Sequence, residues 1–492
     1  MSHPRYPALF QINTRVRLAE LAAELGRSAT LDDLTNSELD ALAKAGFDIV
    51  WLLGVWQTGP AGRNVSLSNS HLIQEYRSML PDFQGSDVCG SPFAIRNYRV
   101  HQDFGGDEAL LRIRQRLSDR GIRLMLDFVP NHTALDHFWV TEHPDFYVYG
   151  TEQQLAAEPQ NYCRVVTGKG EQILAYGRDP YFPGWPDTLQ LNYANPNLQQ
   201  AMTTELLRIA TQCDGVRCDM AMLELPEVFA RTWGVHAESF WPKVTEAVHR
   251  QNPDFLFMAE VYWDLEWTLQ QQGFNYTYDK RLYDRLHERN AQSVRQHLIA
   301  GMDFQDKLAR FLENHDEPRA GATFPGAVHR AAAIITFFTP GLRFFHQGQL
   351  QGRKVRISMH LDRGPTEPID QELASFYDSV VQQLRDPSFR DGEWLLLSCS
   401  AAWDGNWTAE SFIAFAWTGP RGERRLVTVN YSDHNSQCYV TLPWPGLQDR
   451  NWRLQDRMST AAYDRQGLEL ATRGLYLDLP AWQYHIFDIQ PA

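Results

Sequence analysis

The chain has 492 residues, which is more than one ordinary hydrophobic core organises, so we expect two or three domains. Its composition, 43% apolar and 22% charged, is typical of a globular protein. The net charge of −14 argues against nucleic acid and against an anionic membrane surface as partners.

The first residues, MSHPRYPALF, contain no apolar segment typical of a secretory signal, so we expect a cytoplasmic protein. A strand is predicted over 7–16. Thr35 and Glu38 have the spacing of a capping box, which predicts the start of a helix, and Gly46 predicts its end. A buried strand over 48–53 follows, and this strand–helix–strand order favours a parallel pair.

The alternation of strand and helix continues to about residue 390. Six further strands are predicted, at 122–128, 215–219, 255–261, 273–278, 308–313 and 342–346. Helices are predicted between most of them, at 107–120, 197–212, 225–251, from Lys280 and at 327–338. Together with the first two strands this makes eight units, which predicts an α/β fold of the (β/α)8 TIM barrel type.

Two segments depart from this pattern. Residues 133–190 are rich in Pro, Gly, Tyr and Trp without clear periodicity, which indicates an inserted lid or small domain after the third strand. Residues 391–492 contain short alternating apolar runs separated by turn clusters, which indicates an all-β sandwich. The barrel would then comprise 1–132 and 191–390.

Four acids stand at the carboxyl ends of predicted barrel strands: Asp127, Asp219, Glu260 and Asp316. The carboxyl ends of the strands carry the chemistry in this fold, so we expect these acids to converge at one mouth. Arg217 shares a strand face with Asp219, and its charge should lower the pKa of that carboxyl and keep it ionised. Paired carboxylates on either side of a glycosidic bond are what glycoside hydrolysis requires.

These acids lie in four ordered motifs: DFVPNH (127–132), GVRCDMAM (215–222), AEVYW (259–263) and ENHDEPR (313–319). The ordered set resembles the α-amylase superfamily of retaining α-glycoside hydrolases over roughly residues 5–390. The stretch SPFAIRNY (91–98) also resembles the corresponding part of that family. The resemblance implies a (β/α)8 barrel with an inserted B domain after strand 3 and a C-terminal β-sandwich.

The resemblance further implies three catalytic residues. Asp219 would attack the anomeric carbon and form a covalent glycosyl-enzyme, Glu260 would act as acid and then base, and Asp316 would bind the distorted sugar ring. Two inversions would retain the α-anomer, with the carboxyl groups of Asp219 and Glu260 about 5–5.5 Å apart.

Six more residues would bind or position the substrate by the same resemblance: Arg217, His132, His315, Phe93, Asp127 and Arg319. Phe93 stands where the family usually carries a stacking Tyr. Asp127 would support the site rather than react, and Arg319 could contact substrate or hold its loop. Three tryptophans near the mouth could be sugar platforms, although we favour loop packing for each: Trp56, Trp185 and Trp263.

The sequence also departs from the family. Met222 and Leu223 stand where many members carry Lys-His, which would give an apolar patch after the nucleophile. No cofactor and no required metal is expected, because the inserted segment has Gln190 where an Asp is frequent and Asn131 alone is weak evidence for calcium. The substrate would be a small carbohydrate, an α-glucoside or short gluco-oligosaccharide, and the oligomeric state stays open.

Two alternatives to hydrolysis remain. A transglycosylase or phosphorylase would use the same intermediate, and a phosphate acceptor would need a basic cluster, for which four residues flank the eighth strand: Arg343, Arg353, Lys354 and Arg356. A non-catalytic amylase-like scaffold would have lost catalytic positions, whereas all three carboxylates are present.

Overall fold

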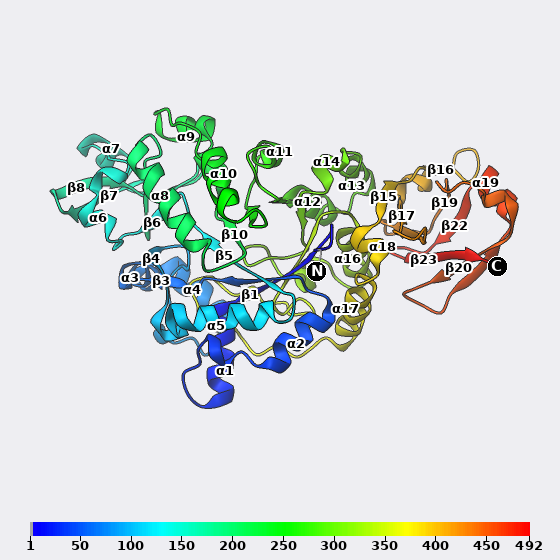
Figure 1. Ribbon diagram of the computed structural model, residues 1–492, viewed down its shortest axis with the longest axis horizontal. Helices are drawn as coiled ribbons and strands as arrows, with labels where there is room; N and C mark the ends of the chain where they lie inside the picture. The colour runs from blue at the N-terminus through cyan, green and yellow to red at the C-terminus, as the bar shows by residue number, and fades with distance from the viewer. Residues whose placement is uncertain (1–2) are drawn as a thin grey trace.

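The computed structural model describes residues 3–492, and its centre is a closed barrel of eight parallel strands (Figure 1). Each strand pairs with its neighbour in chain order, and the last pairs with the first. The barrel strands are β1 (Ala8–Asn13), β2 (Ile49–Leu53), β5 (Arg123–Phe128), β10 (Gly215–Cys218), β11 (Leu256–Ala259), β12 (Tyr276–Tyr278), β13 (Leu308–Arg310) and β14 (Leu342–His346). The predicted (β/α)8 barrel is therefore confirmed.

Helices connect the barrel strands and cover the outside of the barrel (Figure 1). The longer ones are α1 (Thr14–Leu25), α2 (Asn36–Ala45), α3 (Pro60–Ser68), α4 (Ser70–Met79), α5 (Gly106–Ser118), α8 (Pro196–Ile209), α9 (Pro226–Trp233), α10 (Trp241–Gln251), α12 (Lys280–His287), α13 (Ala291–Leu298), α16 (Ala327–Phe338) and α17 (Gln371–Gln383). Short helices lie at α11 (Glu266–Gln270), α14 (Met302–Gln305), α15 (Ala320–Thr323) and α18 (Pro387–Asp391).

Local hydrogen bonds explain where the first helices begin and end. The Asn13 side chain accepts from the Val16 N–H and starts α1, so β1 is shorter than the predicted strand 7–16. At α2, the Thr35 hydroxyl accepts from the Glu38 N–H at 3.2 Å, as predicted. The Glu38 carboxylate instead pairs with Arg17 at 3.0 Å, so only half of the capping box forms.

The segment between β5 and α8 forms its own small structure beyond the barrel. The strands β6 (His132–Ala134) and β9 (Thr188–Gln190) pair at its base. A hairpin of β7 (Tyr162–Thr167) and β8 (Gly170–Ala175) projects outward, next to α6 (Trp139–Glu142) and α7 (Glu152–Ala157). Figure 1 shows this segment at one end of the molecule. Another short pair, β3 (Trp56–Thr58) and β4 (Ile95–Val100), flanks the long connection after β2.

The C-terminal region lies at the opposite end and is built of antiparallel sheets, as predicted (Figure 1). A six-stranded sheet contains β15 (Glu393–Leu396), β17 (Phe412–Thr418), β18 (Arg424–Asn430), β23 (Tyr484–Pro491), β20 (Trp452–Asp456) and β21 (Ala462–Arg465). A three-stranded sheet contains β16 (Cys399–Ser400), β19 (Ser436–Val440) and β22 (Leu475–Leu479). The predicted run 474–488 is two strands in different sheets, and α19 (Gly467–Thr472) precedes it.

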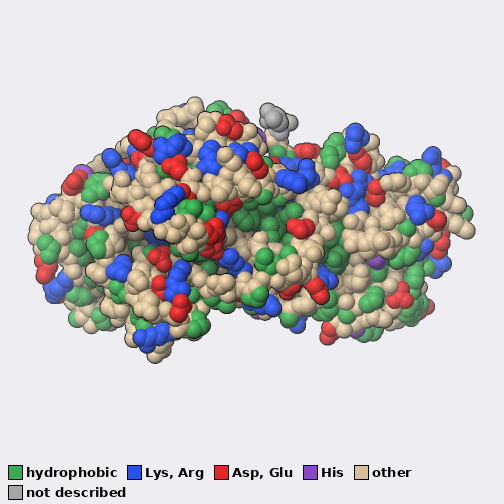
Figure 2. Space-filling model, turned by 90° about the horizontal axis from the view of Figure 1, so that it is seen from below, with side chains coloured by type: hydrophobic (Ala, Val, Ile, Leu, Met, Phe, Trp, Pro, Cys, Tyr) green, Lys and Arg blue, Asp and Glu red, His purple; other side chains and the backbone are tan. Residues whose placement is uncertain are grey.

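Surface charge and helix length are relevant to the prediction that neither nucleic acid nor a membrane is a partner. On the face in Figure 2, acidic and basic side chains are interspersed over much of the surface. Among the described residues, none of the helices has both the length and the apolar character needed to cross a membrane.

Candidate active site

A pocket of about 420 Å³ lies where the carboxyl ends of the barrel strands meet the segments beyond them. Asp219 and Glu260 directly follow β10 and β11, and Asp316 lies in the turn after β13. All three carboxylates line this pocket, so the structure brings the predicted catalytic residues together.

Arg217 connects two of these acids. Its Nη1 donates to Asp219 Oδ1 at 2.6 Å, and its Nη2 donates to Glu260 Oε2 at 2.6 Å. The guanidinium is fully buried, and Phe93 lies under it at 5.0 Å from the ring centre. One buried cation therefore fixes the orientation of two carboxylates on neighbouring strands.

The pKa of Asp219 differs from our expectation. Burial raises the pKa of this carboxyl, and although Arg217 pulls it down, burial is the larger effect and the net pKa is above the ordinary value. The nearby charges of Asp316 and Asp127 add to the rise. Arg217 does lower the pKa of Asp219, as predicted, but the net shift is upward, because the sequence did not reveal how deeply the carboxyl is enclosed.

Glu260 is the acid in this pocket that holds a proton near neutral pH. Burial raises its pKa to about 7, against the lowering effect of Arg217, and the charge of Asp219 contributes. Its two oxygens accept hydrogen bonds from the Met220 N–H at 2.9 Å and from the Tyr262 hydroxyl at 2.8 Å. A carboxyl with these properties can donate a proton at neutral pH and accept it back.

Asp316 is different from the other two acids because its side chain is open to the pocket, 44% exposed, and contacts His315 Nε2 at 3.0 Å. Burial opposes ionisation, but the nearby His315, Arg217 and Arg356 together outweigh it and lower the pKa of Asp316 to about 2. His315 is itself held by Gln11, whose Nε2 lies 2.9 Å from Nδ1. Asp316 is thus an ionised acceptor facing the cavity.

His132 and Phe93 also line the pocket. Burial lowers the pKa of His132 to about 3, so this imidazole is neutral and can hydrogen-bond a hydroxyl group. Its ring lies 5.2 Å from that of Trp185, which also faces the pocket. Trp185 therefore is available as an aromatic wall, contrary to the loop-packing interpretation.

Three of the predicted substrate-binding residues lie outside the pocket lining: Arg217, Asp127 and Arg319. Arg217 reaches the pocket only through the two carboxylates that it contacts. Asp127 is buried and accepts from Trp51 Nε1 at 3.1 Å and from the Gly54 N–H at 2.7 Å, which supports a positioning role. Arg319 pairs with buried Glu313 at 2.9 Å, so of the two alternatives for Arg319 the geometry favours holding its loop.

The other two tryptophans do not line the pocket. Trp56 is buried and donates its indole N–H to the Asp127 carbonyl at 2.7 Å. Trp263 packs edge-on against Tyr181, with ring centres 4.9 Å apart. For these two, packing is the role that the contacts support.

The apolar patch expected from Met222 and Leu223 is not in the pocket. Both side chains are buried in the core in a 3-10 turn, η5 (Ala221–Glu224). The pocket is lined instead by Met220, whose backbone has a positive φ of 46° and is strained for a residue with a side chain. This expectation was wrong because the left-handed residue redirects the chain into the protein.

The remaining pocket residues come from distant segments that the motifs did not identify. Helix α4 contributes Glu75, the inserted segment contributes Asp187, and the segment after β14 contributes Arg356 and His360. Burial raises the pKa of Asp187 to about 6 and lowers that of His360 to about 4. None of these residues stands at a predicted strand end, and of the four only Arg356 was singled out in the sequence, as part of the basic cluster that flanks the eighth strand.

The oxygens around Asn131 already have a hydrogen-bond donor from the protein. Gln190 Nε2 lies 3.0 Å from the Asn131 carbonyl, 2.8 Å from Asn131 Oδ1 and 3.1 Å from the Leu191 carbonyl. An amide nitrogen thus stands among three oxygens that could otherwise face a cation. Within residues 3–492 the structure contains no cluster of three or more His, Cys, Asp or Glu side chains suited to a metal ion.

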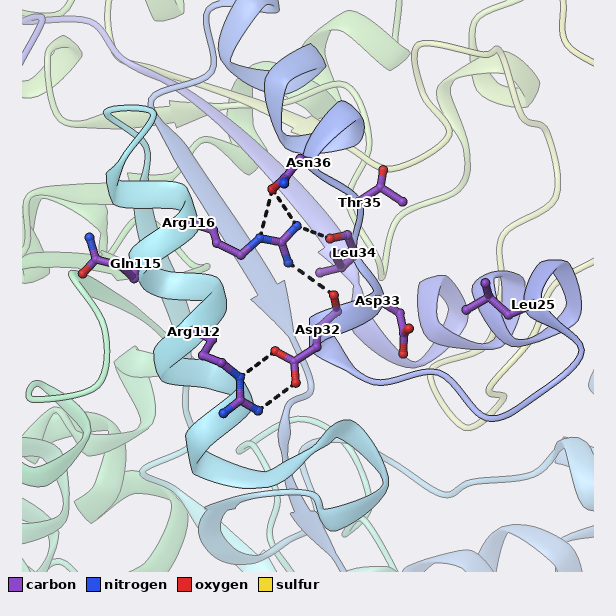
Figure 3. Close-up of a pocket in the computed structure, with 9 residues that line it drawn as sticks. All are labelled: Leu25, Asp32, Asp33, Leu34, Thr35, Asn36, Arg112, Gln115 and Arg116. Carbon is purple, nitrogen blue, oxygen red and sulfur yellow. Dashed lines mark hydrogen bonds and ion pairs between the residues drawn. The ribbon is translucent and has the colours of Figure 1, made fainter.

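A larger cavity, about 760 Å³, lies on the outer surface of the barrel beside α5 (Figure 3). Its acids are already paired: Asp32 with Arg112 at 2.7 Å and Asp33 with Arg27. These charges satisfy one another at the exposed surface, so both carboxylates that line this cavity are already paired.

Comparisons with known proteins agree with this geometry. The profile of the family described as alpha amylase, catalytic domain, matches residues 30–395. Alpha-amylase MalA from Haloarcula japonica is 22% identical over 366 residues, 72% of this chain and 46% of that protein. Maltase 1 from Drosophila virilis is 22% identical over 425 residues, 73% of this chain and 58% of that protein. This chain therefore spans about half the length of the curated relatives it matches.

A crystal structure of AmyB, a maltogenic alpha-amylase from Thermotoga neapolitana, superposes with a TM-score of 0.71 at 17% identity and covers 99% of both chains. At that identity the superposition supports the fold alone. Because the family profile matches most of the sequence, and because the barrel carries the three acids in one pocket, this chain belongs to the α-amylase family.

Proposed function

We propose that this protein is a retaining α-glucoside hydrolase that acts on small α-linked glucosides or short gluco-oligosaccharides. The observation that carries the proposal is the bridge of Arg217 between Asp219 and Glu260, in the same pocket as Asp316. A nucleophile and a proton donor held on adjacent strands match the two carboxyl groups that the retaining mechanism uses.

In the first step, Asp219 attacks the anomeric carbon and the bond to the leaving oxygen breaks. Glu260, whose pKa is about 7, gives its proton to that oxygen. The Asp219 carboxylate becomes a neutral ester, so its charge no longer raises the pKa of Glu260. Glu260 therefore stays ionised at neutral pH, and as the general base it takes a proton from the water that attacks the ester and releases the sugar with its original α configuration.

The walls of the pocket support a small substrate. Helix α4, the inserted segment and the segment after β14 all contribute side chains, and the volume of about 420 Å³ is in the range of small-molecule sites. Arg356 pairs with Glu75 at 2.9 Å across the rim. Asp316 and neutral His132 supply hydrogen bonds to sugar hydroxyls, and Phe93 and Trp185 supply apolar surface.

The positions of the basic residues do not favour phosphorolysis. Arg343 is buried and donates to backbone carbonyls, including that of Phe337 at 2.8 Å. Arg353 pairs with Glu20 at 3.0 Å, and Arg356 alone of the four lines the pocket. A dedicated phosphate site would need several free cations at the mouth.

The test is product analysis by NMR on a panel containing soluble starch, maltotriose, maltose, isomaltose and sucrose, with and without phosphate. We expect one or more small glucosides to release α-glucose first. Asp219→Asn should lose at least about 10⁴-fold in kcat, whereas Asp404→Asn in an exposed loop should match the parent.

Each contrary outcome is informative. Initial β-glucose would refute retention, a sugar phosphate would indicate phosphorolysis, and a new disaccharide would indicate transfer. Equal activity of Asp219→Asn and the parent would remove the proposed nucleophile.

A further inference from the structure

A separate cavity of about 420 Å³ lies between the barrel and the C-terminal sheets. One side is the turn between α12 and α13, which includes Glu288 and Arg289. The other side is formed by the C-terminal residues Trp407, His434 and Trp482. Figure 1 shows α13 beside the first strands of the C-terminal region, far from the inserted segment that walls the active-site pocket.

The cavity presents flat aromatic surface to solvent. Trp407 is 68% exposed, and its ring centre lies 4.9 Å from that of His434. Trp482 packs edge-on against buried Tyr431 at 5.1 Å, and the Tyr431 hydroxyl donates to the Leu286 carbonyl at 2.6 Å. The cavity floor is therefore anchored to the barrel, while the Trp407 indole is left uncovered.

Backbone strain also occurs at this cavity. Five non-glycine residues of the described chain have a positive φ, and two of them, Arg289 at 57° and Trp482 at 59°, line the cavity. A third, Met220, lines the active-site pocket. Strained residues of this kind persist where the surrounding structure fixes them, and they cluster at binding and catalytic sites.

The charged groups around the cavity argue against an anionic ligand. Glu288, Glu410 and Asp433 are exposed acids that line it, and Arg289 is the one lysine or arginine in the lining. An excess of acids disfavours phosphates and other anions. Carboxylates and a guanidinium beside an exposed indole instead suit a ligand with hydroxyl groups around an apolar ring face.

We propose that this junction cavity binds a gluco-oligosaccharide at a site separate from the active site, with one sugar ring on Trp407. The choice of glucose units rests on the proposed function, whereas the carbohydrate class rests on the cavity itself. The bound chain would contact both the barrel turn 288–292 and the C-terminal sheets.

The experiment measures binding without turnover. Asp219→Asn protein would be run in native gels with and without soluble starch, and titrated with maltoheptaose by calorimetry. Adding Trp407→Ala should abolish the starch-dependent retardation and remove one of two binding events, weakening affinity there at least tenfold. Trp407→Phe should retain part of the affinity because it keeps an aromatic face.

The matched control is Trp267→Ala, which removes another exposed indole, 45% exposed, on α11 away from the cavity. It should bind like the parent, and circular dichroism would establish that each variant is folded. Unchanged retardation in the Trp407→Ala variant would overturn the proposal.

Two further outcomes separate this proposal from others. Trp407-dependent binding by a protein that hydrolyses no glucoside would uphold the junction site and refute the proposed function. If Trp407→Ala instead changes the sedimentation coefficient and leaves sugar binding intact, Trp407 contacts a second copy of the chain and the carbohydrate proposal fails.

Discussion

The Nη2 atom of Arg217 lies 2.6 Å from Oε2 of Glu260, so the arginine that orients the proposed nucleophile also contacts the proposed acid/base. A cation at this distance would ordinarily make Glu260 a strong acid. Burial has the larger effect and leaves the pKa at about 7. The pKa of Glu260 therefore depends on two opposing effects, burial and the charge of Arg217. A change in either effect should shift the pH dependence of activity.

The first prediction concerns that pH dependence. Glu260 must be protonated to act as an acid, so kcat/KM should fall as the pH rises through about 7. The Tyr262 hydroxyl stabilises the ionised form of Glu260, so Tyr262→Phe should raise its pKa and move the alkaline limb up by about one pH unit. Kinetics from pH 4 to about 9 on an aryl α-glucoside would check this.

Tyr181→Phe is the control for this prediction, since it removes an exposed hydroxyl outside the pocket. A limb that moves to lower pH in Tyr262→Phe would contradict the assigned direction of the hydrogen bond.

The second prediction concerns Arg319. Replacing it with Met leaves the buried carboxylate of Glu313 without its main partner, which should cost about 3–5 kcal/mol in the free energy of unfolding. The KM for a small glucoside should stay the same, because Arg319 does not line the pocket. Urea unfolding and steady-state kinetics would measure both.

Adding Glu313→Gln should recover part of the stability lost in Arg319→Met, because the unpaired charge is removed. A raised KM in folded Arg319→Met protein would show instead that this arginine contacts the substrate.

The third prediction concerns metal dependence. Because Gln190 donates to the oxygens of Asn131 and Leu191, we expect that neither EDTA nor added Ca²⁺ changes the Tm. Gln190→Leu leaves those oxygens without that donor and should destabilise the protein by about 1–3 kcal/mol. Gln153→Leu, on the exposed surface of α7, should have little effect. A Tm that drops in EDTA and returns with Ca²⁺ would refute the expectation.

The fourth prediction concerns Glu224, which is buried and whose carboxylate oxygens have no hydrogen-bond partner among the described residues. Burial raises its pKa well above the ordinary 4.5, so the folded protein keeps a proton that the unfolded chain releases above that pH. Stability should therefore fall as the pH rises above 4.5, by about 1.4 kcal/mol per pH unit from this group.

Glu224→Met should remove that loss, so its gain in the urea midpoint should be larger at pH 8 than at pH 5. The control is Glu227→Met, which replaces an exposed glutamate three residues further along the chain, in the first turn of α9. An equal effect of Glu224→Met at both pH values would show that the buried carboxyl does not control this dependence.

Local patterns in the sequence were enough to predict the barrel and to identify the acids. Strand and helix periodicities are local, so the eight units could be counted, and acids at strand ends converge wherever such strands close into a barrel. Asp219, Glu260 and Asp316 stand at such strand ends, and all three line one pocket. The antiparallel C-terminal sheets were likewise indicated by alternating apolar residues.

Long-range packing sets which side chains share the pocket and how they are charged, and local patterns do not reveal it. Glu75, Asp187 and His360 meet there because segments far apart in the chain fold over the mouth. Burial raises the pKa of Asp219, and Met222 is buried in the core instead of lining the pocket. Both results depend on all of the surrounding chain. Local sequence patterns fix where a residue sits on its own strand, whereas long-range packing fixes how much water reaches it.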